Sequence, residues 1–325
     1  MNYDEIFSIS SPQDFEKLSL EIFRFQYDRI PVYRKFCDLL KIKPQSVSRL
    51  AEIPFLPIEF FKTHAIIPTG KNPQITFTSS GTTGSLTSKH YVSDLTLYER
   101  SFKLAFEQFY GDPAKMVILA LLPSYLEREG SSLIYMAQHL IESSNQPESG
   151  FYLNNLQKLK ETLDTLEKQG KKVLLIGVSF ALLDLTELHS FKLKNTIIME
   201  TGGMKGRRRE MIREELHNNL KKGFGVDNIH SEYGMTELLS QAYSMGDGVF
   251  ESPPWMKLLI RDPEDALTFL PEGKTGGINV IDLANFNSCA FIATQDLGKD
   301  LGNNKTEVLG RFDNSDIRGC NLLVI

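Results

Sequence analysis

Hydrophobic positions near the start of the chain recur at helical spacing. Phe15, Leu18, Ile22 and Phe25 lie three or four residues apart, so they share one face of a helix. The pattern predicts helices between residues 12 and 50. We therefore expect an N-terminal helical segment over residues 1–70.

In the middle of the chain, short apolar runs alternate with amphipathic segments. The runs at 117–122, 173–178 and 196–200 have the length of buried strands. Strands that alternate with helices are typical of a parallel sheet covered on both faces. Helices are expected between these strands and after them, over residues 131–143, 154–169, 180–189 and 206–222.

The pattern changes in the last third of the chain. Four short apolar segments follow one another with turn residues between them, which indicates a smaller β-rich lobe at about 246–310. These segments cover residues 250–260, 277–282, 290–294 and 306–309. The expected fold class is therefore α/β, with a core over residues 71–310 that holds mixed and parallel sheets covered by helices.

Composition adds size and charge to this picture. The 325 residues are 41% hydrophobic and 24% charged, which suits one large lobed domain or two domains with a sizeable core. The net charge of −5 argues against nucleic-acid binding, because phosphates attract basic surfaces. The longest apolar run, Met116–Leu122, is far shorter than the ~20 residues of a membrane span, so none is expected.

The cysteines indicate the compartment. Cys37, Cys289 and Cys320 are three in number and lie far apart, which argues against a disulfide framework and a structural zinc site. The first residues carry acids and no apolar run, so they do not resemble a signal peptide. We expect a cytoplasmic protein.

Residues 77–85, Phe-Thr-Ser-Ser-Gly-Thr-Thr-Gly-Ser, are the strongest chemical signal. Glycines allow a close backbone approach, and the hydroxyl and backbone N–H groups can surround a phosphate. The alternative is a solvated turn, which is the better interpretation of such a run taken alone. The segment is not a Walker A loop, because the terminal Lys-Ser/Thr is missing.

Three further polar segments follow in order. In Ser-Glu-Tyr-Gly-Met-Thr-Glu, residues 231–237, a hydroxyl and a carboxylate after a glycine can bind phosphate and Mg²⁺, or the segment simply begins a helix. Asp296 follows an apolar strand, where an acid commonly binds a ribose diol or forms a turn. Arg311 can bind ribose or phosphate, or form a surface ion pair.

The order of these four segments resembles the motif series of the adenylate-forming superfamily over roughly residues 50 to 320. Within it the chain most resembles the acyl-protein synthetases (LuxE-type), with phenylacetate–CoA ligases as the next relatives. The resemblance also involves residues 200–206 (Glu-Thr-Gly-Gly-Met-Lys-Gly), 296–298 (Asp-Leu-Gly) and 316–320 (Asp-Ile-Arg-Gly-Cys).

This resemblance implies an adenylate-forming large-domain fold that uses ATP and Mg²⁺ to activate a fatty or aromatic carboxylic acid. It also implies a hinge-like tail over residues 311–325 and the absence of the small C-terminal domain found in typical members. The implied contacts are Ser79, Ser80, Gly81, Thr82, Thr83 and Gly84 with the ATP phosphates; Gly202, Gly203 and Tyr233 with adenine; Thr236 with the α-phosphate; Glu237 with Mg²⁺; and Asp296 and Arg311 with ribose or phosphate.

For the second step, the resemblance implies that Cys320 accepts the acyl group and that an acyl-CoA reductase-type partner receives it. Arg318 would favour the reactive thiolate, although free cysteines are also common as small buried residues. Two alternatives stay open: a ligase that uses CoA or a carrier protein, and a non-catalytic nucleotide-binding subunit. The chain departs from the superfamily pattern at Thr87, where a lysine is frequent, and we expect that it also departs at its end, without the domain that carries a catalytic lysine.

Overall fold

The computed structural model describes residues 3–79, 86–123, 130–202 and 211–311. The chain forms two compact units, each with its own core. The first unit consists of Met1–Ile75, Ser88–Leu97 and Glu251–Ile325, and the second of Thr76–Thr87 and Tyr98–Phe250.

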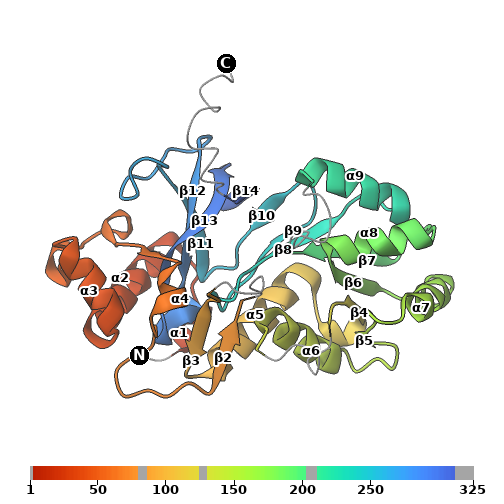
Figure 1. Cartoon of the computed structure of the whole chain (residues 1–325), viewed down its shortest axis with the longest axis horizontal. Coiled ribbons are helices and arrows are strands. Elements are labelled where there is room, and N and C mark those ends of the chain that lie inside the picture. Colours follow the sequence, from red (N-terminus) through yellow and green to blue (C-terminus); the bar gives the residue numbers. More distant parts are fainter. Residues whose placement is uncertain (1–2, 80–85, 124–129, 203–210, 312–325) are drawn as a thin grey trace. The chain divides into compact units, whose positions relative to one another are not determined.

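A mainly parallel sheet forms the centre of the second unit (Figure 1). Its strand order is β5-β4-β6-β7-β8-β9; β5 to β8 are parallel and β9 is antiparallel to β8. Strands β4 and β6 are buried along their whole length, as expected for apolar runs covered on both faces. The bounds are β4 (Val117–Leu121), β5 (Gly150–Phe151), β6 (Val173–Val178), β7 (Thr196–Thr201), β8 (His230–Tyr233) and β9 (Ala242–Ser244).

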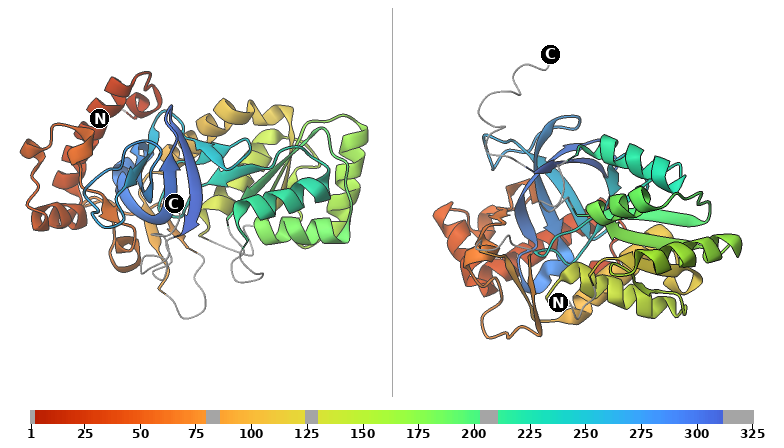
Figure 2. Two further views of the ribbon diagram at one scale, coloured as in Figure 1. Left: turned by 90° about the horizontal axis from the view of Figure 1, so that it is seen from above. Right: turned by 45° about the vertical axis from the view of Figure 1, so that its right-hand side comes forward.

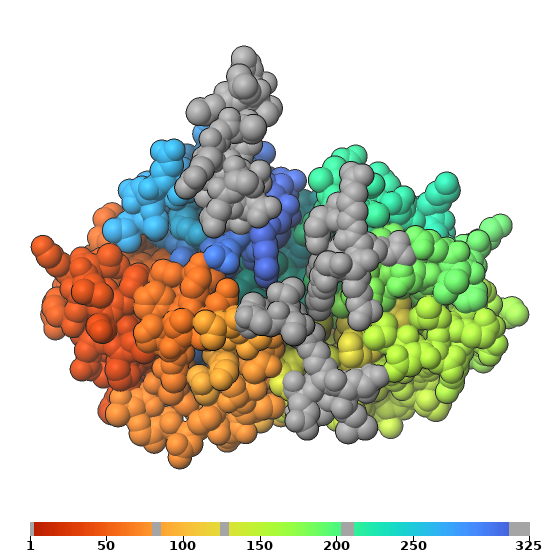
Figure 3. Space-filling model, viewed as in Figure 1, coloured from red at the N-terminus to blue at the C-terminus, as the bar shows by residue number. Residues whose placement is uncertain are grey.

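Helices cover both faces of this sheet. Helices α8 and α9 lie on one face, and α5 and α6 on the other (Figure 2). Helix α9 lies at the surface of the unit (Figure 3). Its residues Leu216, Leu220 and Phe224 are buried. The bounds are α5 (Leu95–Tyr110), α6 (Ser132–Ser144), α7 (Leu156–Lys168), α8 (Ser179–Leu188) and α9 (Arg213–Phe224), with a 3₁₀ turn, η3 (Pro113–Lys115), before β4.

The expected helices and strands of this region are confirmed, with one correction. The helix predicted over 206–222 begins at Arg213 in the described part of the chain and ends at Phe224. Glu214 and Glu215 lie in its first turn, where acidic side chains favour a helix start. Gly225, with φ +69°, ends it in the left-handed conformation.

The first unit contains an antiparallel sheet in the order β11-β12-β13-β14, with β1 parallel to β13. The single strand expected over 250–260 is two strands, because Pro253 and Pro254 cannot donate ladder hydrogen bonds. The bounds are β1 (Leu56–Pro57), β3 (Lys89–Val92), β11 (Met256–Arg261), β12 (Thr275–Asp282), β13 (Phe291–Asp300) and β14 (Lys305–Arg311). Most residues of β2 (Ile75–Thr78) and β10 (Val249–Glu251) belong to the second unit.

The N-terminal helices pack against this sheet through buried groups. The Gln26 amide donates to the carbonyls of Asn285 (2.9 Å) and Phe286 (3.0 Å) and accepts from the Ala290 N–H (3.0 Å), which ties α2 to the β12–β13 connection. The elements are α1 (Asp4–Phe7), α2 (Pro12–Arg29), α3 (Pro31–Leu39), α4 (Phe60–Thr63), η1 (Pro44–Ser46), η2 (Leu50–Glu52) and η4 (Leu283–Asn287). In none of the described ranges is a helix both long and apolar enough to cross a membrane.

Two cysteines belong to this core. Cys37 and Cys289 are buried free thiols. Burial raises the pKa of Cys37 to about 12 and also raises the pKa of Cys289. Both thiols therefore stay protonated near neutral pH, which suits a structural role.

Candidate functional site

The predicted phosphate loop lies mostly outside the described residues. Strand β2 leads directly to Ser79, whereas residues 80–84 are not described. The N–H of Thr78 donates to the Gly130 carbonyl at 2.7 Å, so the end of β2 is attached to the residue before α6. The role of the loop stays a prediction.

The predicted adenine contacts lie on neighbouring parallel strands. Gly202 directly follows β7, and Tyr233 is the last residue of β8. Parallel strands end at the same edge of a sheet, where α/β proteins commonly bind ligands. Gly202 has φ +67°, a conformation that favours glycine, and its carbonyl accepts a 2.6 Å hydrogen bond from the Ser179 hydroxyl. Gly203 lies outside the described residues.

The predicted phosphate and metal contacts follow on the same edge. Thr236 and Glu237 lie in the turn after β8, in which the Leu238 N–H donates to the Met235 carbonyl at 3.0 Å. Glu237 is 5% exposed. Four predicted site residues of the second unit are thus grouped at the carboxyl ends of β7 and β8: Gly202, Tyr233, Thr236 and Glu237.

One face of this strand pair carries an ionic network that the sequence did not reveal. Arg213 Nη1 donates to Glu200 Oε1 at 2.8 Å and to the Ser231 hydroxyl at 3.2 Å. His217 Nε2 lies 3.6 Å from the same carboxylate oxygen. Burial alone would raise the pKa of Glu200, but the His217, Arg213 and Ser231 interactions outweigh it and lower the pKa. Glu200 is therefore ionised, and the network fixes the end of β7.

The opposite face carries a second acid with a different environment. Thr201 Oγ1 donates a hydrogen bond to Glu232 Oε2, and the two residues are partners in the β7–β8 register. Burial raises the pKa of Glu232 to about 7; the Thr201 hydrogen bond opposes that rise, and the charge of Glu200 adds to it. Glu232 in turn raises the pKa values of Tyr110 and Tyr243, whose own burial is the larger cause.

In the first unit, the predicted ribose contacts face each other. Asp296 on β13 and Arg311 on β14 are partners across the antiparallel ladder, next to a register shift at Leu297 and Gly298. Directly opposed residues have Cβ atoms about 5 Å apart, so both side chains can reach one diol.

Arg261 supports the strand end that carries Asp296. Its guanidinium donates to the Ile278 carbonyl at 2.7 Å and to the Thr294 carbonyl at 2.6 Å. The Thr294 hydroxyl accepts from the Asp296 N–H at 3.1 Å. A Cβ atom on Gly277 would lie 2.5 Å from Arg261 Cζ, so a larger residue there would displace the guanidinium. Sequence motifs gave no sign of Arg261, because its partners lie on other strands.

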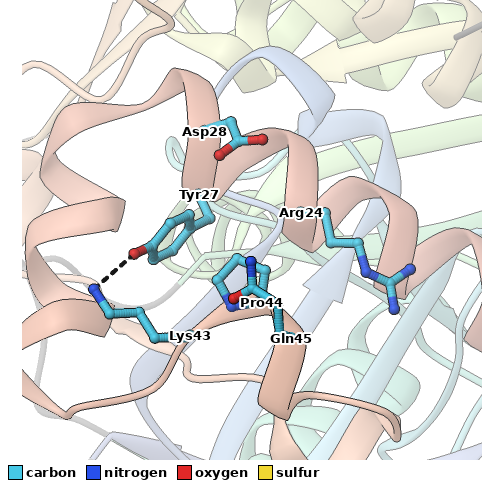
Figure 4. Close-up of a pocket in the computed structure, with 6 residues that line it drawn as sticks. All are labelled: Arg24, Tyr27, Asp28, Lys43, Pro44 and Gln45. Carbon is cyan, nitrogen blue, oxygen red and sulfur yellow. Dashed lines mark hydrogen bonds between the residues drawn. The ribbon is translucent and has the colours of Figure 1, made fainter.

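Two pockets formed by described residues of the first unit include none of these motif residues. A pocket of about 420 Å³ is lined by Arg24, Tyr27, Asp28, Lys43, Pro44 and Gln45 (Figure 4). Its Lys43 ammonium already pairs with Asp38 at 2.6 Å and donates to the Tyr27 hydroxyl at 3.1 Å. A second pocket of about 340 Å³, lined mainly by apolar residues of 42–55 and 266–269, also includes no motif residue.

Comparison with known proteins gives the family. Residues 7–106 and 131–325 match the family described as acyl-protein synthetase, LuxE. The chain belongs to the acyl-protein synthetase (LuxE) family. The chain is similar to the long-chain-fatty-acid–luciferin-component ligase of Aliivibrio fischeri. The two sequences are 25% identical over 91% of this chain and 84% of the ligase. The resemblance inferred from the motifs, and the assignment to the ligases, are confirmed.

Solved structures with the same fold are adenylate-forming enzymes. ATP-bound MatB from Rhodopseudomonas palustris is 19% identical, with a TM-score of 0.54 over 73% of this chain and 47% of that chain. The chain thus spans about half the length of MatB. A 2-hydroxyisobutyryl-CoA ligase in its thioesterification state is 15% identical, with a TM-score of 0.67 over 94% of this chain and 70% of that chain. The predicted fold class is confirmed.

Proposed function

We propose that this acyl-protein synthetase activates a fatty acid with ATP and transfers the acyl group to its own Cys320. In the first step, a carboxylate oxygen bonds to the α-phosphorus of ATP as the bond to the β-phosphate breaks, which releases pyrophosphate. In the second step, the Cys320 thiolate bonds to the acyl carbon, and AMP leaves. The thioester then passes to an acyl-CoA reductase-type partner.

The observation that carries this proposal is the family match across residues 7–106 and 131–325, which includes the motif segments and the region of Cys320. The name of the Aliivibrio fischeri relative supports a long-chain fatty acid as the substrate. The ATP bound to MatB, which has the same fold, supports ATP as the nucleotide.

We propose which part of ATP each group of motif residues binds. Residues 79–84 bind the phosphates, and Gly202, Gly203 and Tyr233 hold adenine. Thr236 contacts the α-phosphate. Asp296 and Arg311, opposed on β13 and β14, bind the ribose diol. Because the step brings two anions together, donors aimed at the phosphates stabilise the developing charge.

Glu237 is the residue proposed to hold Mg²⁺. Among the described residues, no group of three or more His, Cys, Asp or Glu side chains could hold a metal ion. Mg²⁺ nevertheless fits, because it is commonly bound by one or two carboxylates together with substrate phosphates and water. When bound, the ion would neutralise phosphate charge.

Acyl transfer to the protein tests the proposal. Incubation with ATP, Mg²⁺ and a radiolabelled long-chain fatty acid should leave a hydroxylamine-labile label on the native protein, and Cys320→Ser should lose at least about 95% of it because a hydroxyl is a far weaker nucleophile. Cys37→Ala is the matched control, since that thiol is buried and protonated. Equal labelling of Cys320→Ser would show that the acceptor is another group.

Two alternatives give different results in the same assay. If free CoA discharges the adenylate to a soluble thioester without labelling the protein, the chain is a CoA ligase. If no acid in a panel of fatty and aromatic acids supports ATP–pyrophosphate exchange, the chain is a non-catalytic subunit. The free thiols of Cys37 and Cys289 support our proposal of a reducing, cytoplasmic location.

A further inference from the structure

The bond between Thr201 and Glu232 joins the two segments proposed to hold adenine. Thr201 directly precedes Gly202 on β7, and Glu232 directly precedes Tyr233 on β8. The two residues are register partners, and the Thr201 hydroxyl donates to the Glu232 carboxyl group. The side-chain bond therefore lies one residue before each proposed adenine contact.

The second oxygen of the same carboxyl group packs against the turn that follows. A methyl group at Gly234 would fall well inside van der Waals contact of Glu232 Oε1. The chain at this point leads from Tyr233 to Thr236 and Glu237. One oxygen of Glu232 thus bonds to β7, while the other lies against the turn toward the proposed phosphate and metal contacts.

Glu232 changes its charge near neutral pH in surroundings of low polarity. Burial is the main cause that raises its pKa to about 7. Burial also lowers the pKa of His230 and raises the pKa values of both nearby tyrosines, so these groups are neutral there. No described basic group contributes to the shift of Glu232. The titratable groups around it are Glu200 on β7, Tyr243 on β9 and Tyr110 on α5, and Tyr110 in turn contacts His230 on β8.

We propose that Glu232 is a positioning residue that, together with Thr201, holds the two adenine-side segments in register and makes ATP binding depend on pH. The inference rests on the proposed function. Neutral Glu232 keeps the hydrogen bond and adds no charge, whereas ionised Glu232 adds a negative charge beside the segment that would receive an anionic nucleotide. ATP binding is therefore strongest below pH 7.

The test is ATP–pyrophosphate exchange between pH 6 and pH 8.5 at saturating acid. In the native protein, KM for ATP should rise about fivefold across this range, with kcat changing less, because an added buried charge opposes anion binding. In Glu232→Gln, KM should stay flat, since the amide can still accept from Thr201. Glu148→Gln is the matched control: this acid pairs with Lys171 near the other end of the same sheet and should follow the native curve.

The hydrogen bond is tested separately at Thr201. Thr201→Val should raise KM for ATP about fivefold at every pH and leave kcat within about twofold, because the lost bond loosens binding without touching the reacting atoms. Thr201→Ser keeps the hydroxyl and should restore the native value, which a general packing role would not predict. Circular dichroism and thermal unfolding verify that each variant is folded.

Two results would overturn the inference. Native-like pH dependence of KM in Glu232→Gln would show that another group titrates, and an unchanged KM in Thr201→Val would show that the bond does not position the nucleotide. If the native protein itself exchanges no pyrophosphate with any acid, the proposed function fails, and this inference fails with it.

Discussion

Glu200 and Glu232 lie in adjacent rows of the β7–β8 ladder, and their side chains point to opposite faces of the sheet. Toward α9, Glu200 has the Arg213 guanidinium at 2.8 Å and His217 at 3.6 Å, and its pKa is lowered. Toward α5, Glu232 has the Thr201 hydroxyl and two buried tyrosines nearby, and its pKa is raised.

The difference between the two faces shows what decides the charge of a buried acid. Both carboxyl groups lose hydration, but only Glu200 gains a cation and several donors in return. A permanently ionised group with fixed partners holds the backbone in place over a wide pH range. A group with one neutral donor is free to titrate, and Glu232 does so next to the proposed nucleotide segments.

The largest expected effect comes from removing the cation on the α9 face. Arg213→Met leaves the Glu200 carboxylate buried without its ion pair, and we expect a loss of about 3–5 kcal/mol in the free energy of unfolding. Methionine retains apolar contact with Phe250, over which the guanidinium lies at 5.0 Å. Urea denaturation at pH 7 measures the loss.

A control on the same helix separates this effect from a general loss of charge. Lys221 lies 4.0 Å from Asp247, whose side chain is 85% exposed. Lys221→Met should change stability by less than about 0.5 kcal/mol, since exposed pairs contribute little. If both variants unfold at the same urea concentration, the Glu200 network is not a structural anchor.

On the α5 face, substitution of Glu232 should change the free energy of unfolding by a smaller amount. The change should be a stabilisation, and it should depend on pH. The pKa of Glu232 is about 7 in the folded protein, above its ordinary 4.5. As pH rises from the unfolded pKa of about 4.5 toward the folded pKa of about 7, the unfolded chain releases a proton that the folded chain retains, so the native protein loses stability. Glu232→Gln lacks this loss and should be more stable than the native protein at pH 8 by on the order of 2 kcal/mol, with little difference at pH 5.

Urea denaturation of both proteins at the two pH values measures this prediction. Glu148→Gln provides the reference for an amide substitution elsewhere in the sheet, and its effect should be similar at pH 5 and pH 8. A stabilisation by Glu232→Gln that is equal at both pH values would arise from packing, and Glu232 would then not titrate near neutrality.

Much of the second unit could be predicted from local patterns. The apolar runs of β4 and β6 are continuous because both faces are buried, and their predicted bounds differ from the structure by at most one residue. Gly202 could also be placed at a sheet edge, because it follows an expected strand, whereas the strand that ends at Tyr233 was not predicted. The hydrophobic pattern predicts a strand reliably where burial alone determines which residues are apolar.

Interactions between distant residues could not be predicted in this way. Glu200 and Arg213 are joined across a segment with no repeating pattern, and Arg261 binds carbonyls of two other strands. The break between β10 and β11 was missed as well, although Pro253 and Pro254 lie between the two strands and cannot donate ladder hydrogen bonds. Glu232 was part of a predicted motif, but its role depends on Thr201, which only the register of β7 and β8 brings beside it.

The smallest expected effect concerns the turn against which Glu232 packs. In Gly234→Ala the new methyl group meets Glu232 Oε1, the end of a flexible side chain, so we expect a loss of about 1 kcal/mol in the free energy of unfolding. In a Glu232→Ala background that oxygen is gone, and the same substitution should cost little. A double-mutant cycle measured by urea denaturation would then give a coupling energy of about 1 kcal/mol. Additive effects of the two substitutions would place the strain elsewhere, for example at Gln241, whose Cγ would lie 3.2 Å from the new methyl carbon.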